Sequence, residues 1–327
     1  MWLQRQDRGS SGIMTALRSR KHRLGRQRDW LVGAVLLTAV LILVESTLGW
    51  SAVLAPWATL PPWVLAAAFL LTAASYLLRA IRVRVYFQTE LAGRFPALLR
   101  LSVLHNSANN LLPMRAGEVL FPWLMRRYFG HGFWAAGASL IWIRLLDLHF
   151  LGVIGLLVLW TRAPSPWWGL LVLGWLGLLP LFWLAGRVQR QAGAEGGEGR
   201  WRRLLGVVAA AAPRERGQVL RLYRWTALSW SLKFVAFALI LGHFVPAALW
   251  QLLLGVMGAE LSTVLPFHGI AGSGSFELAT VAALVPLGVA PAQALAGAVN
   301  LHLFLLGTTL VLGAGALLIP IRGQRGG

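Results

Sequence analysis

Two short segments of this sequence place charged residues beside helix-breaking ones, inside stretches that are otherwise apolar. The first, Leu112 to Glu118, reads Leu-Pro-Met-Arg-Ala-Gly-Glu, and the second runs from Leu265 and Pro266 through three glycines to Glu277. A broken helix leaves backbone amides free to bind an anion, and a guanidinium offers planar donors that suit a phosphate. Charge and irregular backbone are costly in a membrane, so these two segments, here called the elbows, are the candidate functional site.

The predicted site adds the polar side chains near the elbows and those of the apolar run that follows the first elbow. Arg144 and Asp147 are three residues apart and therefore share one face of a helix. The predicted substrate contacts are Asn109, Asn110, Arg115, Glu118, Arg144, Asp147, Glu260 and Glu277, and the predicted hinge residues are Pro113, Gly117, Pro266, Gly269, Gly272 and Gly274.

Structural roles remain open for several of these residues. Arg115 and Glu118 could simply neutralise each other to close a turn. Arg144 and Asp147 could be a pair that pins two helices together, and the two asparagines could cap the elbow. Weaker candidates are the lone polar groups of apolar runs, which often bond only to a neighbour: Lys233, His268, Asn300 and His302.

Composition identifies a polytopic membrane protein, with 57% hydrophobic and 13% charged residues. The net charge of +19 comes from basic residues that flank the apolar runs, and no nucleic-acid motif accompanies them. We therefore interpret them as topology signals and anionic-lipid contacts, and we expect no nucleic-acid partner. Cysteine is absent, no catalytic or metal-binding spacing is present, and the glycine cluster lacks the Lys-Ser/Thr of a P-loop, so we expect no metal, cofactor or catalytic residue.

The hydropathy pattern predicts an all-α protein with about six full transmembrane helices. Arginine-rich segments between them should be cytoplasmic, including the N-terminal arm, the stretch Arg79 to Arg100 and a basic loop at 187–224, which places both termini in the cytoplasm. The predicted spans are Trp30 to Trp50, Pro61 to Ala80, Phe133 to Trp160, Trp167 to Gly186, Trp225 to Phe244 and Pro291 to Ile319.

Each elbow lies in a segment that must cross the membrane an even number of times. The arm from Val119 to Phe129 has only about 11 residues, short of the roughly 20 that a spanning helix needs, so both segments are predicted to be re-entrant helical hairpins. The order span, span, hairpin, span then occurs twice with opposite orientation, which is the pattern of an inverted-topology repeat. Coincidence remains the alternative, because Leu-Pro-Gly breaks are common in membrane helices.

The predicted domain organisation is a basic tail at 1–29, one membrane domain at 30–320 and a short tail at 321–327. Within the membrane domain, the first repeat covers about 30–163 and the second about 164–320.

At the elbow residues the sequence resembles the lysylphosphatidylglycerol synthase family, in its flippase-like membrane domain. The resemblance rests on Asn109 to Glu118, on Arg144-Leu145-Leu146-Asp147 and on Pro266 to Glu277, and it covers roughly residues 30 to 320. It implies a bacterial inner-membrane protein that moves an anionic or aminoacylated phospholipid between leaflets. The soluble aminoacyl-transfer domain of two-part members has no counterpart in this sequence.

Three functions follow as hypotheses. The first is translocation of a phosphate-bearing lipid through a polar midplane cavity between the hairpins, with Arg115 and Arg144 as phosphate ligands. The alternatives are a membrane-embedded transferase with Glu118 or Glu277 as general base, and a non-catalytic subunit that assists a lipid-modifying or glycosyl-transferring enzyme. Few acidic residues are present to serve the transferase, so translocation is favoured.

Overall fold

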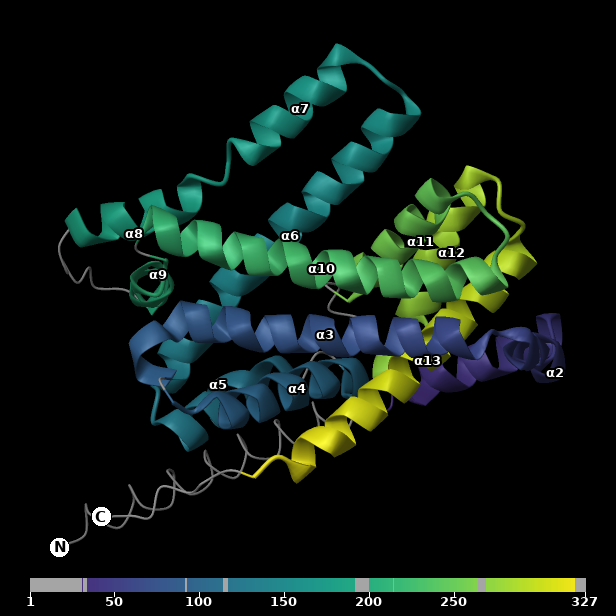
Figure 1. Ribbon diagram of the computed structural model, residues 1–327, viewed down its shortest axis with the longest axis horizontal. Coiled ribbons are helices and arrows are strands. Elements are labelled where there is room, and N and C mark those ends of the chain that lie inside the picture. The colour runs from purple at the N-terminus through teal and green to yellow at the C-terminus, as the bar shows by residue number, and fades with distance from the viewer. Residues whose placement is uncertain are drawn as a thin grey trace, which may run out of the picture.

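The computed structural model describes residues 31, 34–91, 93–113, 117–191, 200–213, 215–263 and 269–320. Helices are the only regular elements of this part of the chain, which confirms the all-α prediction (Figure 1). The four longest are α3 (Pro62–Phe87), α6 (Phe133–Arg162), α10 (Arg216–Phe244) and α13 (Pro291–Leu318). At about 1.5 Å per residue each is roughly 40 Å long, enough to cross a hydrocarbon core of about 30 Å.

Six stretches are long and apolar enough to span a membrane, the number expected, but their membership differs from the prediction. The expected first span is a helix over Ala34–Thr47 that bends by 92° into Trp50–Thr59, where α2 (Trp50–Leu54) and η1 (Ala55–Thr59) lie. Gly49 occupies the bend with φ +76°, a conformation that glycine adopts without strain, while the apolar run continues through it. The added candidate is Ile270–Leu287, expected as one arm of a hairpin.

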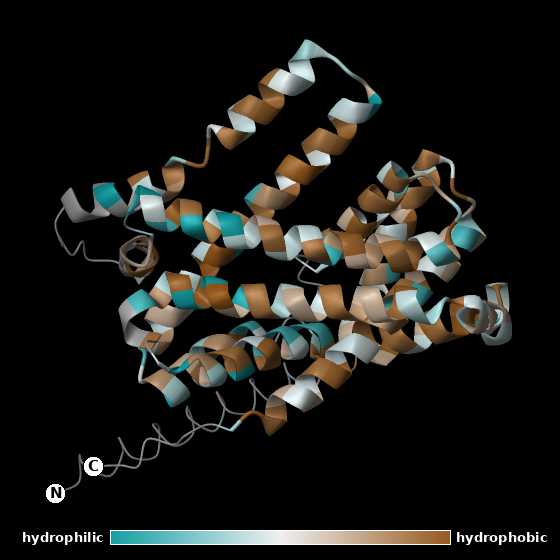
Figure 2. Ribbon diagram, viewed as in Figure 1, coloured by the Kyte–Doolittle hydropathy of each residue, from teal (hydrophilic) through white to brown (hydrophobic). Residues whose placement is uncertain are grey.

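The long helices pack around a core between α3 and α10, which lie side by side (Figure 1). Phe237, Ile240 and Leu241 of α10 are fully buried there. The hairpin of α6 and α7 (Pro166–Leu176) projects from this core, and Figure 2 shows that it is largely hydrophobic. Its exposed apolar side chains, such as Trp167 at 74%, are those expected to face lipid acyl chains.

Two pairs of short helices form the predicted hairpins: α4 (Phe95–Leu111) with α5 (Gly117–Phe129), and α11 (Leu249–Ser262) with α12 (Ser275–Leu284). Their lengths of 10 to 17 residues correspond to about 15 to 26 Å, less than the hydrocarbon thickness. Helix α12 is, however, part of the longer stretch Ile270–Leu287, which is long enough to span. That both hairpins enter and leave the bilayer on the same side stays a prediction, as does the inverted repeat.

A glycine allows close approach of the two arms in each hairpin. A Cβ on Gly117 would lie 2.4 Å from the backbone nitrogen of Asn109, and a Cβ on Gly258 would lie 2.6 Å from the backbone oxygen of Ala279. Neither neighbouring atom can rotate away, so an added methyl group would have to separate the arms.

Replacing Gly117→Ala or Gly258→Ala should therefore destabilise the protein, at a cost of about 1–3 kcal/mol for the forced separation. Thermal unfolding in detergent measures the effect. Gly315→Ala is the matched control, because a Cβ there meets no atom within 4 Å. An alanine variant that unfolds at the same temperature as the control would show that its hairpin does not require the close approach of the two arms.

Candidate functional site

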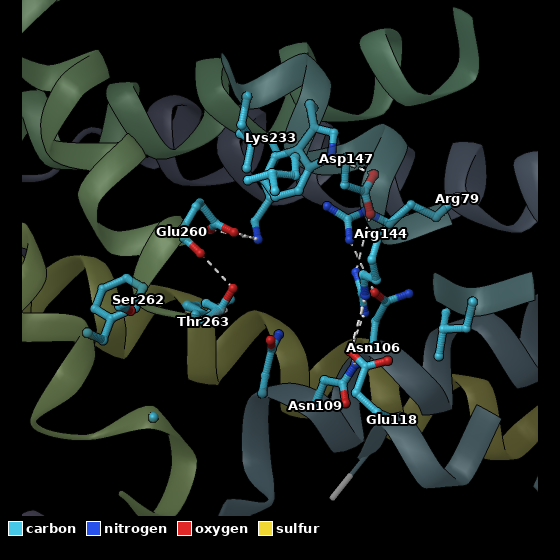
Figure 3. A pocket seen from close by; sticks show the side chains of 18 of the residues that line it. Arg79, Asn106, Asn109, Glu118, Arg144, Asp147, Lys233, Glu260, Ser262 and Thr263 are labelled. Carbon is cyan, nitrogen blue, oxygen red and sulfur yellow. Dashed lines mark hydrogen bonds and ion pairs between the residues drawn. The ribbon is translucent and has the colours of Figure 1, made fainter. Parts of the chain in front are cut away.

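A cavity of about 500 Å³ lies between the two hairpins and the long helices around them (Figure 3). The first hairpin contributes Asn109, Asn110 and Glu118 to its wall, and the second contributes Thr263 and Phe276. Helix α4 also contacts η4 (Ile270–Gly272), directly before α12. The two hairpins thus meet around one space, whose volume is in the usual range for a small-molecule site.

Asp147 of α6 is the most heavily bonded group in the wall. Its Oδ1 accepts hydrogen bonds from Arg82 of α3 and, at 2.8 Å, from the indole nitrogen of Trp230 of α10, and its Oδ2 lies 3.3 Å from Nη1 of Arg144. The carboxylate is 4% exposed. It therefore joins three helices and has little capacity left for a ligand.

Glu118 and Arg144 join the first hairpin to α6. The Nε and Nη2 atoms of Arg144 donate to Oε1 of Glu118 at 3.1 and 2.8 Å, and Asn109 donates to the same oxygen at 3.1 Å. His105 supports the group, because its Nδ1 lies 3.0 Å from the carbonyl oxygen of Gly117 and so carries the hydrogen, leaving Nε2 to face the donors of Asn109 and Arg144. The Arg144 side chain keeps 28% exposure and can still contact a ligand.

A second ion pair lies across the cavity. The ammonium of Lys233 on α10 lies 2.7 Å from each carboxylate oxygen of Glu260 on α11 (Figure 3). Lys233 also lies over the rings of Trp230 and Phe237, at 5.3 and 5.0 Å from their centroids. Lys233 was expected to be a minor polar group, but it forms this wall of the site.

Arg79 of α3 is a cation of the cavity that was not among the predicted site residues. Arg79 and Arg82 are only 7% and 3% exposed, and Arg79 lines the cavity. Nη1 of Arg79 donates to Oδ1 of Asn106 at 3.3 Å, and the guanidinium lies 4.8 Å from the ring centroid of Trp230. Arg79 is buried because it contacts Asn106 of α4 and Trp230 of α10. Arg82 is buried because it bonds to Asp147 of α6 and Thr226 of α10.

Glu277 and His302 share a proton at the cavity wall, where His302 is a lining residue. His302 Nε2 lies 2.8 Å from the carbonyl oxygen of Ala271 and must carry a hydrogen, while Nδ1 lies 2.5 Å from Oε1 of Glu277. A proton must lie between these last two atoms, on either the imidazole or the carboxyl, because two acceptors would repel. The pair is neutral overall in both cases.

The second elbow is a tight turn that supports this pair. Gly272 and Gly274 have φ of +82° and +86°, and Ala271 is held at φ +58°. Oε2 of Glu277 accepts from the backbone nitrogen of Gly274 at 2.8 Å, which caps α12. The predicted hinge glycines are thus required by backbone conformation at two positions.

The structure brings most of the predicted contacts together and leaves a few elsewhere. Arg115, Pro266 and His268 lie outside the described residues. Asn300 bonds Trp57 and the carbonyl of Val53 instead, so it pins α13 to the bent N-terminal segment. The cavity wall contains six of the eight predicted substrate contacts, namely Asn109, Asn110, Glu118, Arg144, Asp147 and Glu260.

Helical hairpins around a charged cavity define this chain as a polytopic membrane protein with its polar site inside the helix bundle. The family model described as the lysylphosphatidylglycerol synthase TM region matches residues 30–313. The chain therefore belongs to that family, and the family points to a function related to membrane lipids. Among curated proteins, no significant match is found.

Glu277 provides a test of the shared proton. In Glu277→Gln the amide can still donate to Nδ1 of His302 and accept from Gly274, so stability should stay within about 1 kcal/mol of wild type. Glu277→Ala removes both bonds and should cost about 2–3 kcal/mol. Thermal unfolding distinguishes the two variants, and equal losses would show that the amide cannot replace the hydrogen bonds of the carboxyl group, which would contradict this assignment.

Proposed function

We propose that this protein moves a phosphate-bearing lipid between the leaflets of a bacterial inner membrane, as a flippase or scramblase. The observation that carries the proposal is the cavity of about 500 Å³, which places the cations Arg79, Arg144 and Lys233 inside a bundle of membrane-spanning helices. Charge at this depth is costly and is retained in membrane proteins mainly along substrate or ion pathways. A lipid headgroup is a ligand that such a site can bind.

An apolar stripe on α6 supports a lipid as the ligand. Ile141, Leu145 and Leu148 line the cavity and are also 45%, 41% and 44% exposed. They recur at helical spacing on the face that carries Arg144. Acyl chains can follow this stripe while the headgroup lies among the cations of the cavity.

The bonding of the carboxylates argues against the transferase. Among the described residues, Glu118 pairs with Arg144, Asp147 with Arg82, and Glu260 with Lys233. A general base needs a lone pair directed at its substrate, whereas each of these carboxylates has an oxygen directed at a cation. The oxygens of Glu277, the other candidate base, bond to His302 and to the backbone nitrogen of Gly274. Product formation from a lipid-linked donor by the purified protein would reverse this ranking.

The contacts also support the inverted repeat. The cation of the second predicted span in each half bonds to the first arm of its hairpin 27 residues later, Arg79 to Asn106 and Lys233 to Glu260. The glutamate that begins the second arm bonds to the next long helix 26 or 25 residues later, Glu118 to Arg144 and Glu277 to His302. We infer two re-entrant hairpins related by the repeat, whose tips form the translocation site.

Topology gives a direct check of this arrangement. We propose that both termini and the basic loop at 187–224 are cytoplasmic and that residues 51–60 are external. Since the chain has no native cysteine, Ala58→Cys and Glu215→Cys can be labelled singly with an impermeant maleimide. They should react from opposite sides of inverted and right-side-out vesicles, and reaction from the same side would contradict the inverted repeat.

Leaflet exchange tests the function itself. The purified protein is reconstituted in liposomes with acyl-labelled fluorescent phospholipids, and exchange is followed by quenching of the outer leaflet. Gly137 lines the cavity, and a Cβ there meets no atom within 4 Å, so Gly137→Trp should obstruct the space and Gly137→Ala should not. An obstruction of about 1–3 kcal/mol slows exchange by a factor of roughly five to over a hundred. Exchange equal to that of empty liposomes, or equal in both variants, would contradict the proposal.

A further inference from the structure

Arg79 differs from the other cations around the cavity in its partners. Arg82, Arg144 and Lys233 each form an ion pair with a carboxylate, whereas no carboxylate of the described residues lies within 4 Å of Arg79. The two undescribed segments that adjoin the elbows, 114–116 and 264–268, contain no Asp or Glu in their sequence. They therefore cannot supply the missing counter-ion.

The comparison of the two halves explains this difference. Lys233 and Arg79 occupy corresponding positions, and each bonds to the residue 27 positions later. In the second half that residue is Glu260, which neutralises its cation, and in the first half it is Asn106, a neutral amide. The first half thus keeps the cation and lacks the anion.

The unbonded atoms of Arg79 form one edge of its guanidinium. Nη1 is bonded to Asn106, while Nε and Nη2 are buried and have no hydrogen-bond partner. These two donors are parallel and can bind two oxygens of one anion, a geometry that suits a phosphodiester. Both atoms are closed to solvent, so the adjoining wall must move for an anion to reach them.

The charge of the surrounding groups indicates the class of ligand. Four cations, Arg79, Arg82, Arg144 and Lys233, face three carboxylates, Glu118, Asp147 and Glu260, and the pair of Glu277 and His302 is neutral. Among the described residues, one positive charge is left over. A headgroup with net negative charge neutralises it, whereas a zwitterionic headgroup brings a further cation.

We propose that Arg79 is the phosphate ligand of the cavity and that the site selects lipids with a net negative headgroup. The inference rests on the proposed function, since it names the substrate class of the same cavity. Trp230 positions the guanidinium, because its ring covers one face of Arg79 and its indole nitrogen is held by Asp147.

Binding is measured first, independently of transport, by the shift in thermal unfolding when phosphatidylglycerol or phosphatidylcholine is added to the purified protein in detergent. Phosphatidylglycerol should raise the unfolding temperature of the wild type and of Gly315→Ala, which alters an exposed, uncharged position outside the cavity. It should not raise that of Arg79→Met. Equal shifts with the two lipids in the wild type would overturn the inference.

A second variant, Asn106→Asp, keeps Arg79 and places a carboxylate beside it. This carboxylate would neutralise Arg79 as Glu260 neutralises Lys233 in the second half, so the variant should no longer respond to phosphatidylglycerol. Without lipid, Arg79→Met should unfold at a temperature no lower than that of the wild type, because it removes an unpaired buried charge. Arg82→Met should unfold at a lower temperature, because it removes the cation that is paired with Asp147. A full lipid response in Asn106→Asp would contradict the assignment.

Leaflet exchange then separates this inference from the proposed function. Wild type should exchange acyl-labelled phosphatidylglycerol about tenfold faster than phosphatidylcholine, a factor within reach of one charge-assisted hydrogen bond, and the two rates should become equal in Arg79→Met. Exchange without preference would refute the inference and leave translocation standing. Lipid binding that depends on Arg79, without any leaflet exchange, would refute the proposed translocation and leave the role of Arg79 standing. Displacement of phosphatidylglycerol by inorganic phosphate would assign the site to a free anion and overturn the lipid assignment.

Discussion

Pairing of buried charge is the constraint on which this structure depends. A charged side chain inside a bilayer costs several kcal/mol unless a partner neutralises it. Asp147 meets that requirement for Arg82 and contributes to it for Arg144, and it also holds Trp230. Through these bonds one carboxylate fixes α3, α6 and α10 relative to one another, and the cavity is the space that remains between them and the hairpins.

In both halves of the chain, a glutamate joins the hairpin to the following long helix, although its partner residue differs. Each hairpin begins its second arm with a glutamate that is bonded to the following long helix, to Arg144 in the first half and to His302 in the second. The departure from equivalence is at Asn106 and Glu260, where one half has an amide and the other a carboxylate. The cavity therefore has a neutralised side at Lys233 and a cationic side at Arg79.

Much of this architecture was predictable from the sequence because membranes restrict the possible folds. Long apolar runs predicted the helices, and the charged elbows predicted Glu118, Arg144, Asp147 and Glu260 as neighbours of one cavity. The predictions were incomplete where they relied on a local rule and the outcome depended on tertiary contacts. Arg79 and Arg82 were not predicted as site residues because arginines near a span end usually lie at the surface, and the bend at Gly49 was missed because hydropathy does not register backbone direction. The pairing of Glu277 with His302 joins residues 25 apart and has no local signature.

The central claim is that the phosphate of an anionic lipid binds Arg79 inside the bundle. A structure determined by electron microscopy in nanodiscs that contain phosphatidylglycerol tests it most directly. The account predicts density for a phosphate within hydrogen-bonding distance of Nε and Nη2 of Arg79, with acyl-chain density along Ile141, Leu145 and Leu148. A carboxylate bonded to that edge of Arg79, or a cavity that contains only water, would contradict it.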